Sequence, residues 1–206
     1  MKTRSIILCI ALFVITINIT NAQSFQFGGQ IGFDIANSYW ANKVEYMEKV
    51  YYPMASYNIN FIINYKISKV GISIEPGVIQ KGGVAKYMDE KFRHQINYIQ
   101  FPLLFNYYIT DNLYFSIGPE LSYMISANVK AKDSKNDNLE FFDKRMEVSG
   151  IVDITYNIIK NINIGVRYNH GITSIKKAIF VDQYGNELGE SKIFNQYFQL
   201  FLKFKK

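Results

Sequence analysis

The chain contains 206 residues with a formal net charge of +6, and it has 16 Tyr, 16 Phe and a single Cys. Its length suits one domain, and one cysteine excludes a fold that depends on disulfides. The basic residues are scattered along the chain, which argues against nucleic acid as a partner.

Residues 1–22 have the layout of a secretory signal peptide. Two basic residues open the segment, residues 6–17 are mostly apolar, and small residues lead up to Ala22. A membrane anchor, the alternative, needs about 20 apolar residues, and this run is shorter. We therefore predict export, cleavage after Ala22, and one domain at residues 23–206.

Apolar and polar residues alternate with a period of two along most of that domain, which is the pattern of half-buried strands. In residues 99–109 the odd positions are all apolar, whereas the even positions include Gln100 and Asn106. The alternation predicts eight strands, at 25–35, 57–66, 70–78, 99–109, 113–125, 147–158, 162–169 and 194–204.

Two kinds of connection alternate strictly between these strands. The short polar turns lie near 67–69, 110–112 and 159–161, and the long polar segments lie near 37–52, 81–93, 128–144 and 176–191. Strict alternation places every long loop at one end of an up-and-down meander. An even strand number with this loop asymmetry is typical of bacterial outer-membrane barrels. The fold class is therefore an all-β, eight-stranded antiparallel up-and-down transmembrane β-barrel.

The alternation alone leaves open which face points outward, because a soluble ligand-binding barrel would have its apolar face inside. The polar face is rich in Gly, Ser and Asn, which suit a narrow filled interior. The apolar face is too dense in Phe, Ile, Leu and Tyr for a surface exposed to water. Aromatic residues near the strand ends fit interfacial girdles. They are Tyr39, Trp40, Tyr51 and Tyr52 near the long loops, and Tyr65, Tyr107, Tyr156 and Phe204 near the short turns.

Four charged residues on the polar face, Asp153, Arg167, Glu75 and Glu120, are predicted to lie in the lumen. An Arg or Lys facing lipid at mid-membrane costs about 2–4 kcal/mol. A turn centred on residue 160 would place Asp153 directly across from Arg167, so the two would form an ion pair. Such a cluster is either a gate or proton path, or a structural plug. We favour the plug, because small barrels have interiors filled by side chains.

The three strand prolines, Pro76, Pro102 and Pro119, each lack a ladder donor. A closed barrel has no edge strand that tolerates such a loss. We therefore predict β-bulges at all three prolines.

The residues that carry catalytic chemistry are sparse. His170 and Ser174 fall on one strand face, which raises the possibility of a lipid hydrolase, but they are two strand steps apart and no acid accompanies them. Two isolated histidines, with no cysteine after cleavage, do not make a transition-metal site. We predict no catalytic residue, cofactor or metal.

Three stretches resemble the PorT-like outer-membrane β-barrel family of Gram-negative bacteria. They are ISIEPGVIQKGG, INYIQFPLLFNYYITDNLYFSIGPELSYMIS and GIVDITYNIIKNINIGVRYNHGITSI. This resemblance implies an eight-stranded barrel in the outer membrane. The best-known member of the family is similar to a secretion-system component, which makes an accessory role in secretion or envelope assembly one expectation.

The function predicted from these observations is that of a non-enzymatic outer-membrane barrel. Its long loops would bind outer-membrane lipid, or envelope or secretion proteins. Two alternatives remain open at this point, a narrow porin-like channel for small solutes and a lipid-modifying enzyme.

Overall fold

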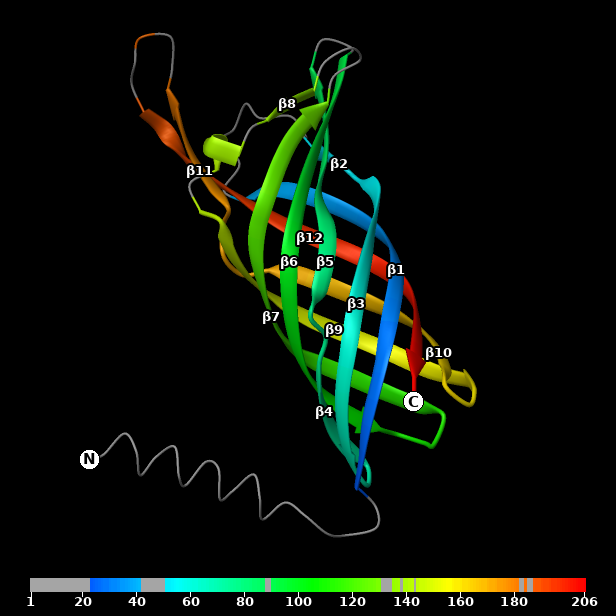
Figure 1. Cartoon of the computed structure of the whole chain (residues 1–206). Coiled ribbons are helices and arrows are strands. Elements are labelled where there is room, and N and C mark those ends of the chain that lie inside the picture. Colours follow the sequence, from blue (N-terminus) through cyan, green and yellow to red (C-terminus); the bar gives the residue numbers. More distant parts are fainter. Residues whose placement is uncertain are drawn as a thin grey trace, which may run out of the picture.

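The computed structural model describes residues 23–41, 51–87, 90–130, 135–137, 139–142, 144–181, 184 and 187–206 (Figure 1). Strands make up nearly all of them, with one short 3-10 helix. The elements are β1 (Gln23–Ala41), β2 (Tyr51–Tyr52), β3 (Met54–Ile67), β4 (Val70–Ile74), β5 (Gly77–Tyr87), β6 (Glu90–Tyr108), β7 (Leu113–Lys130), β8 (Lys135–Asp137), η1 (Leu139–Phe141), β9 (Met146–Ile159), β10 (Ile162–Gly171), β11 (Lys176–Val181) and β12 (Glu187–Lys205). No described helix is long and apolar enough to cross a membrane.

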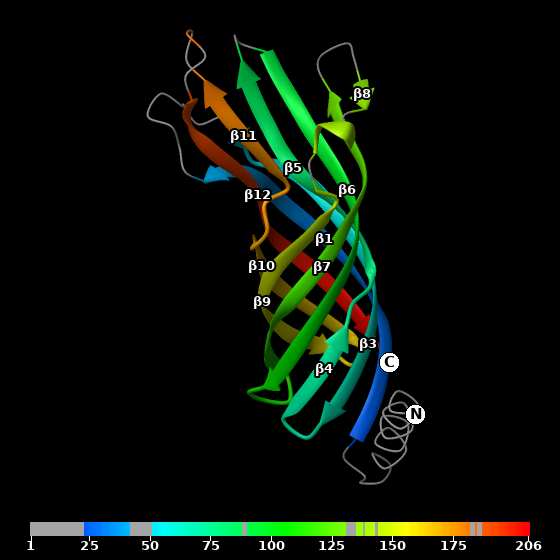
Figure 2. The same cartoon turned by 90° about the vertical axis from the view of Figure 1, so that its left-hand side faces the viewer.

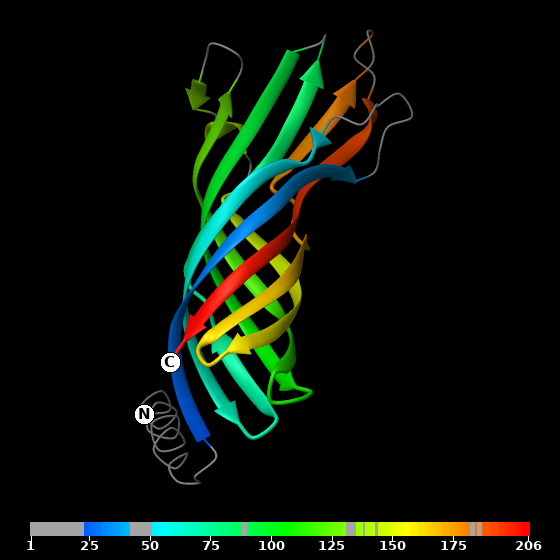
Figure 3. The same ribbon diagram turned by 90° about the vertical axis from the view of Figure 1, so that its right-hand side faces the viewer.

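Eight strand positions close into an antiparallel ring. Their order is β1, β3, β4 with β5, β6, β7, β9, β10 and β12. β4 and β5 share one position, because both pair with β3 and β6 in an unchanged register. The ring closes between β1 and β12, which lie side by side in Figure 3. There Phe27 and Lys206 exchange backbone hydrogen bonds of 2.9 and 2.8 Å. The predicted barrel is confirmed.

The two faces of the wall differ as the alternation predicts. On β6, Phe101 and Leu103 are 49% and 47% exposed, whereas Leu104 between the outward positions is 1% exposed. Outward-facing apolar side chains continue around all eight positions, and Asn, Gln, Ser and charged side chains are buried inside. The polar face therefore lines the lumen, and the apolar face forms the outer surface.

The connections at the two ends differ in length, but the long ones contain more strand than predicted. Segment 81–93 was expected to be a polar loop, yet β5 and β6 pair through it up to Tyr87 opposite Glu90. Likewise β1 extends to Ala41, β7 extends to Lys130, and β11 pairs with the first part of β12. Figures 1 and 2 show these hairpins projecting beyond one end of the ring. The strands continue through these polar segments because pairing within a hairpin satisfies the backbone groups on the facing edges of both strands.

The predicted bulges at the prolines are wrong. Between β6 and β7 the register is the same on the two sides of Pro102 and Pro119, since Pro102 pairs with Glu120 and Phe105 pairs with Ile117. Pro119 pairs with Gly150 of β9 in register, and β4 and β5, which flank Pro76, pair with β6 in one register. The shift between β6 and β7 lies at Asn97/Tyr98 instead.

The ladder tolerates Pro76 and Pro102 because each one lacks a donor but its carbonyl still accepts a hydrogen bond. The Glu75 N–H donates to the Pro102 carbonyl at 3.0 Å, and the Phe61 N–H donates to the Pro76 carbonyl at 2.8 Å. Two donors are thus missing around residues 75–76, which is where β4 ends and β5 begins.

Candidate functional site in the barrel lumen

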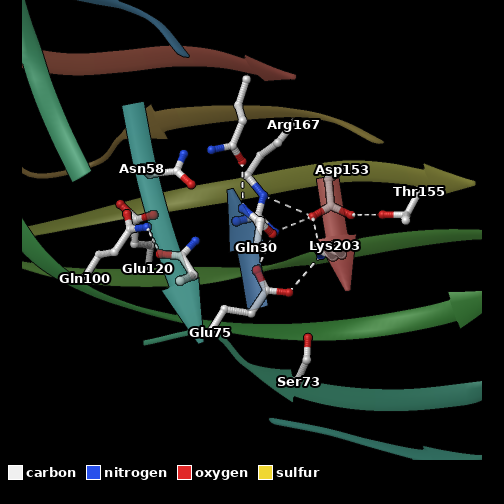
Figure 4. Close-up of polar contacts among 12 residues, drawn as sticks. Gln30, Asn58, Ser73, Glu75, Gln100, Glu120, Asp153, Thr155, Arg167 and Lys203 are labelled. Carbon is white, nitrogen blue, oxygen red and sulfur yellow. Dashed lines mark hydrogen bonds and ion pairs between the residues drawn. The ribbon is translucent and has the colours of Figure 1, made fainter. Parts of the chain in front are cut away.

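Arg167 is the centre of a buried ion cluster in the lumen (Figure 4). Its Nη2 lies 2.7 Å from Asp153 Oδ2 and 2.6 Å from Glu75 Oε2. Lys203 Nζ lies 2.8 Å from Glu75 Oε1 and 3.8 Å from Asp153 Oδ2. We call these four residues the lower cluster, because they lie nearer the short turns than the second cluster described below. Two cations face two carboxylates, so its formal charge is balanced.

The lower cluster joins opposite walls of the barrel. Asp153 and Arg167 are cross-strand neighbours on β9 and β10, whereas Glu75 follows β4 on the other side of the ring. The ring of Phe201 lies beneath both cations, 5.3 Å from Arg167 Cζ and 4.7 Å from Lys203 Nζ. Gly165 makes room for that ring, because a Cβ there would lie 2.3 Å from Phe201 Cζ.

A second cluster surrounds Lys81, and we call it the upper cluster. Lys81 Nζ lies 2.8 Å from both Glu120 Oε1 and Glu147 Oε1. The Tyr197 hydroxyl donates to Glu120 Oε2 at 2.9 Å, and the Asn195 amide donates to Glu147 Oε2 at 2.7 Å. On β9, Glu147 lies farther than Asp153 from the turn at 160–161, which places the upper cluster nearer the long hairpins.

Asp34 is a fifth buried carboxylate, and amide donors hold it. Asn58 Nδ2 lies 3.0 and 2.9 Å from its two oxygens, and Gln199 Nε2 lies 2.8 Å from Oδ1. Isolated charges in a dry interior cost several kcal/mol each unless they are paired and hydrogen-bonded. Nearly every lumen charge meets that condition, so the network is built to remain charged inside the barrel.

The lumen is filled above and below the clusters. Nine buried residues form an apolar cluster on the long-hairpin side, against which Trp40, Leu139 and Phe142 pack. Its members are Ala36, Ile79, Ile96, Tyr98, Met124, Ala127, Ile175, Ile193 and Tyr197. Beside Glu75 and Lys203, the remaining space does not admit a sphere the size of a water molecule.

The structure divides the predicted charge cluster in two. Asp153, Arg167 and Glu75 lie together in the lower cluster, whereas Glu120 lies in the upper one. Sequence reasoning missed Lys203, Lys81 and Glu147. All three lie on the inward face of their strands, and following the alternation past Val78 to Lys81 would have found the cation that holds Glu120.

The aromatic residues predicted to form interfacial girdles do not all lie on the outer face of the barrel. Tyr107, Tyr156 and Phe204 are exposed on the outer face. Tyr65 packs on Phe25 with ring centroids 4.7 Å apart, and Tyr39 stacks on Phe194 at 5.6 Å.

Trp40 corrects the girdle prediction, because it packs against the buried apolar cluster inside the mouth. It is an even-numbered β1 residue, so it shares the inward face of Ala36 and Ser38. Tyr52 lies beneath Lys86 Nζ, which is 4.6 Å from the ring centroid. The side chain of Tyr51 lies outside the described part of the chain.

The sequence profile of the outer membrane protein beta-barrel domain matches residues 21–177. The chain belongs to this family. A search of curated proteins found no match. Solved structures with a similar fold include the attachment invasion locus protein Ail of Yersinia pestis, which has 10% identity and a TM-score of 0.49 over 88% of this chain and 98% of that one. Neisserial surface protein A has 11% identity, covers 88% and 97%, and has a TM-score of 0.48. OprG of Pseudomonas aeruginosa has 12% identity, covers 90% and 96%, and has a TM-score of 0.48.

This outer-membrane barrel is located in the bacterial outer membrane, as predicted. Its outer-face histidine, His170, lies 3.0 Å from the hydroxyls of both Tyr39 and Tyr168. Within the described residues, no hydrogen bond joins His170 to Ser174. No three His, Cys, Asp or Glu side chains in that part of the chain are placed to hold a metal ion.

Proposed function

We propose that this outer-membrane barrel is a non-enzymatic membrane anchor whose external hairpins bind a partner or a surface component. The observation that carries the proposal is that β5, β6 and β7 continue well past the apolar band on their outer faces. A barrel whose only task was to span the membrane would need strands of about 9–11 residues, whereas β6 has 19.

A ladder of amide and hydroxyl side chains marks the end of that band. Asn97 and Gln95 alternate with the buried Ile96 and Tyr98, so they point outward. Gln80 Nε2 donates to Asn97 Oδ1 at 3.1 Å, and Asn97 Nδ2 donates to Ser126 Oγ at 2.8 Å. Below this ladder the outward positions of β6 are Ile99, Phe101, Leu103, Phe105 and Tyr107. The polar ladder therefore fits the outer boundary of the lipid region.

Beyond the ladder, exposed cations face one another across the strands. Lys86 lies directly opposite Lys91, and Arg93 lies directly opposite Lys130. Like charges in direct cross-strand positions destabilise a hairpin unless an anion lies between them. This arrangement favours an anionic partner, either lipid phosphate at the outer surface or an acidic envelope protein.

The resemblance to PorT-like barrels extends the proposal to an accessory role in secretion or envelope assembly. Export through a cleaved leader is part of the same proposal, although residues 1–22 lie outside the described residues. N-terminal sequencing of the protein purified from outer membranes should begin at Gln23. A chain that retains residues 1–22 would contradict the cleavage.

Crosslinking and pull-down from intact outer membranes test the binding role. The variant Arg93→Glu/Lys130→Glu reverses charge on the external hairpins. The control variant Lys69→Glu reverses charge on an exposed turn at the opposite rim. We expect the hairpin variant to lose crosslinked material that the wild type and the control retain. Identical profiles for all three proteins would contradict a binding role for this face.

A further inference from the structure

A pocket of about 230 Å³ lies at the mouth of the barrel that carries the short turns. In outer-membrane barrels this end faces the periplasm. The pocket is separate from the ion clusters and from the external hairpins. Its lining residues are Gln26, Lys66, Tyr108, Asn112, Asn157, Ile158, Ile159, Lys160, Asn161, Asn163 and Lys205.

The lining carries three lysines and no carboxylate. Lys205 is partly buried, and its Nζ donates to the Tyr114 hydroxyl at 3.0 Å. Lys66 Nζ lies 4.1 Å from the centroid of the Tyr108 ring. Within the described residues, no carboxylate oxygen lies within 4.0 Å of Lys66, Lys160 or Lys205.

The rest of the lumen treats its cations differently. Lys81, Arg167 and Lys203 each have a carboxylate oxygen within 2.8 Å. Removing a cation from water without an anionic partner is unfavourable. Lys205 and Lys66 lack the carboxylate partner that the other lumen cations have, and the pocket that they share is therefore where an anion would bind.

Amide N–H groups of asparagine are neutral donors of the kind that hold oxyanions, and four asparagines line the pocket. Two of them already donate to backbone carbonyl groups: Asn157 Nδ2 to the Asp111 carbonyl at 2.8 Å, and Asn163 Nδ2 to the Lys203 carbonyl at 3.3 Å. The side chains of Asn112 and Asn161 make no hydrogen bond to any described residue, so their amides are available to a ligand. The volume is below the roughly 300–1,000 Å³ of pockets for drug-sized ligands, which favours a small ion.

We propose that this pocket binds a small oxyanion, a phosphate or carboxylate group from the periplasm, with Lys205 and Lys66 as its charged ligands and asparagine amides as its neutral ones. The tyrosines behind it close the pocket on the lumen side, since Tyr108 and Tyr114 have ring centroids 5.0 Å apart. The oxyanion would offset the mouth charge without entering the barrel.

The test uses the mature barrel refolded in lipid nanodiscs, with side-chain amide NMR as the readout. Inorganic phosphate, acetate and chloride are titrated separately at constant ionic strength. We expect saturable shifts of the pocket asparagine amides with phosphate or acetate, and none with chloride. The stronger of the two oxyanions identifies the ligand chemistry. Equal effects of all three salts would show general screening and overturn the proposal.

Charge-removing variants locate the site. We expect Lys205→Gln to weaken oxyanion binding about tenfold or more, as loss of a charge-assisted hydrogen bond does. Lys69→Gln removes the same charge from the same rim outside the pocket, and its affinity should stay within about twofold of wild type. Equal weakening by both variants would overturn the proposal. Heat-modifiable migration on gels checks that Lys205→Gln folds, and Lys66→Gln takes its place if it does not.

Discussion

Arg167 and Asp153 lie directly opposite each other on β10 and β9, and two guanidinium nitrogens bind one carboxylate oxygen at 3.0 and 2.7 Å. Because Arg167 also reaches Glu75 at 2.6 Å, the same side chain connects walls of the barrel that lie far apart in the ring. Arg167 therefore links the two walls electrostatically, and its removal would leave the carboxylates of Asp153 and Glu75 with Lys203 as their one cation.

The first prediction concerns the contribution of Arg167 to stability. Arg167→Met should lower the free energy of unfolding by about 3–5 kcal/mol, because it leaves buried charge uncompensated. Urea unfolding in lipid vesicles measures the change. Lys192→Met, which breaks an exposed ion pair of 3.3 Å with Glu190, is the control, and it should cost about 1 kcal/mol or less.

A double variant separates charge from packing. Arg167→Met/Glu75→Gln leaves Lys203 with Asp153, so the lower cluster is again neutral. We expect it to be more stable than Arg167→Met alone. If the double variant is the less stable of the two, the loss at Arg167 is one of packing and the electrostatic account is wrong.

The second prediction concerns conduction. With an apolar cluster above the ion clusters and no water-sized space beside Glu75 and Lys203, the wild-type barrel should give no steady single-channel current in planar bilayers. Arg167→Ala in the lumen and Val166→Ala on the outer face form a matched pair. A steady wild-type current that changes with Arg167→Ala and not with Val166→Ala would establish an ion path and refute the filled lumen.

The third prediction places the membrane. Leu103 is the middle of five outward apolar residues on β6, so Leu103→Lys should destabilise the barrel by about 2–4 kcal/mol in vesicles. Gln95→Lys lies on the same outer face at the far end of the amide ladder, where it removes the 3.2 Å hydrogen bond from Gln95 Nε2 to Gln80 Oε1, and should cost about 1 kcal/mol or less. Comparable costs at the two positions would mean that the lipid boundary does not lie at the ladder.

The fourth prediction concerns the proline ladder. Pro102→Ala restores an N–H opposite the Glu75 carbonyl, and we expect that amide to be strongly protected in hydrogen exchange. The regained hydrogen bond, about 0.5–1.5 kcal/mol, is offset by the extra freedom of the unfolded chain, so stability should change little. Pro53→Ala, at an exposed position between β2 and β3, is the control and should show fast exchange. Fast exchange at residue 102 would mean that the new N–H does not form a hydrogen bond to the Glu75 carbonyl.

The wall of the barrel was predictable because lipid outside and a polar lumen inside impose a period of two on every strand. The same rule placed Asp153 opposite Arg167 once the turn near residue 160 was located. It failed beyond Val78, where polar composition suggested a loop although Ile79 and Lys81 continue the inward face. Composition reports solvent exposure, whereas strand ends depend on whether a hairpin partner satisfies the backbone.

Trp40 and the prolines show a second limit. Trp40 suggested a girdle because tryptophan favours the interface, but its parity on β1 decides its direction and points it inward. The prolines suggested bulges because a donor is lost, yet the carbonyls of Pro76 and Pro102 still accept hydrogen bonds and the register stays intact. Contacts between distant strands, such as Arg167 with Glu75, follow from the curvature of the closed sheet, which no local pattern encodes.

Closure between β1 and β12 has a consequence for the order of assembly. The two strands that must meet lie at opposite ends of the chain, so each remains an unpaired edge until synthesis and export of the whole domain are complete. Unpaired N–H and C=O groups at either edge would be strongly unfavourable in lipid, where every backbone polar group needs a hydrogen-bond partner. Insertion and closure are therefore expected to be a single late event, in which residues near 200 determine whether everything exported before them can enter the membrane.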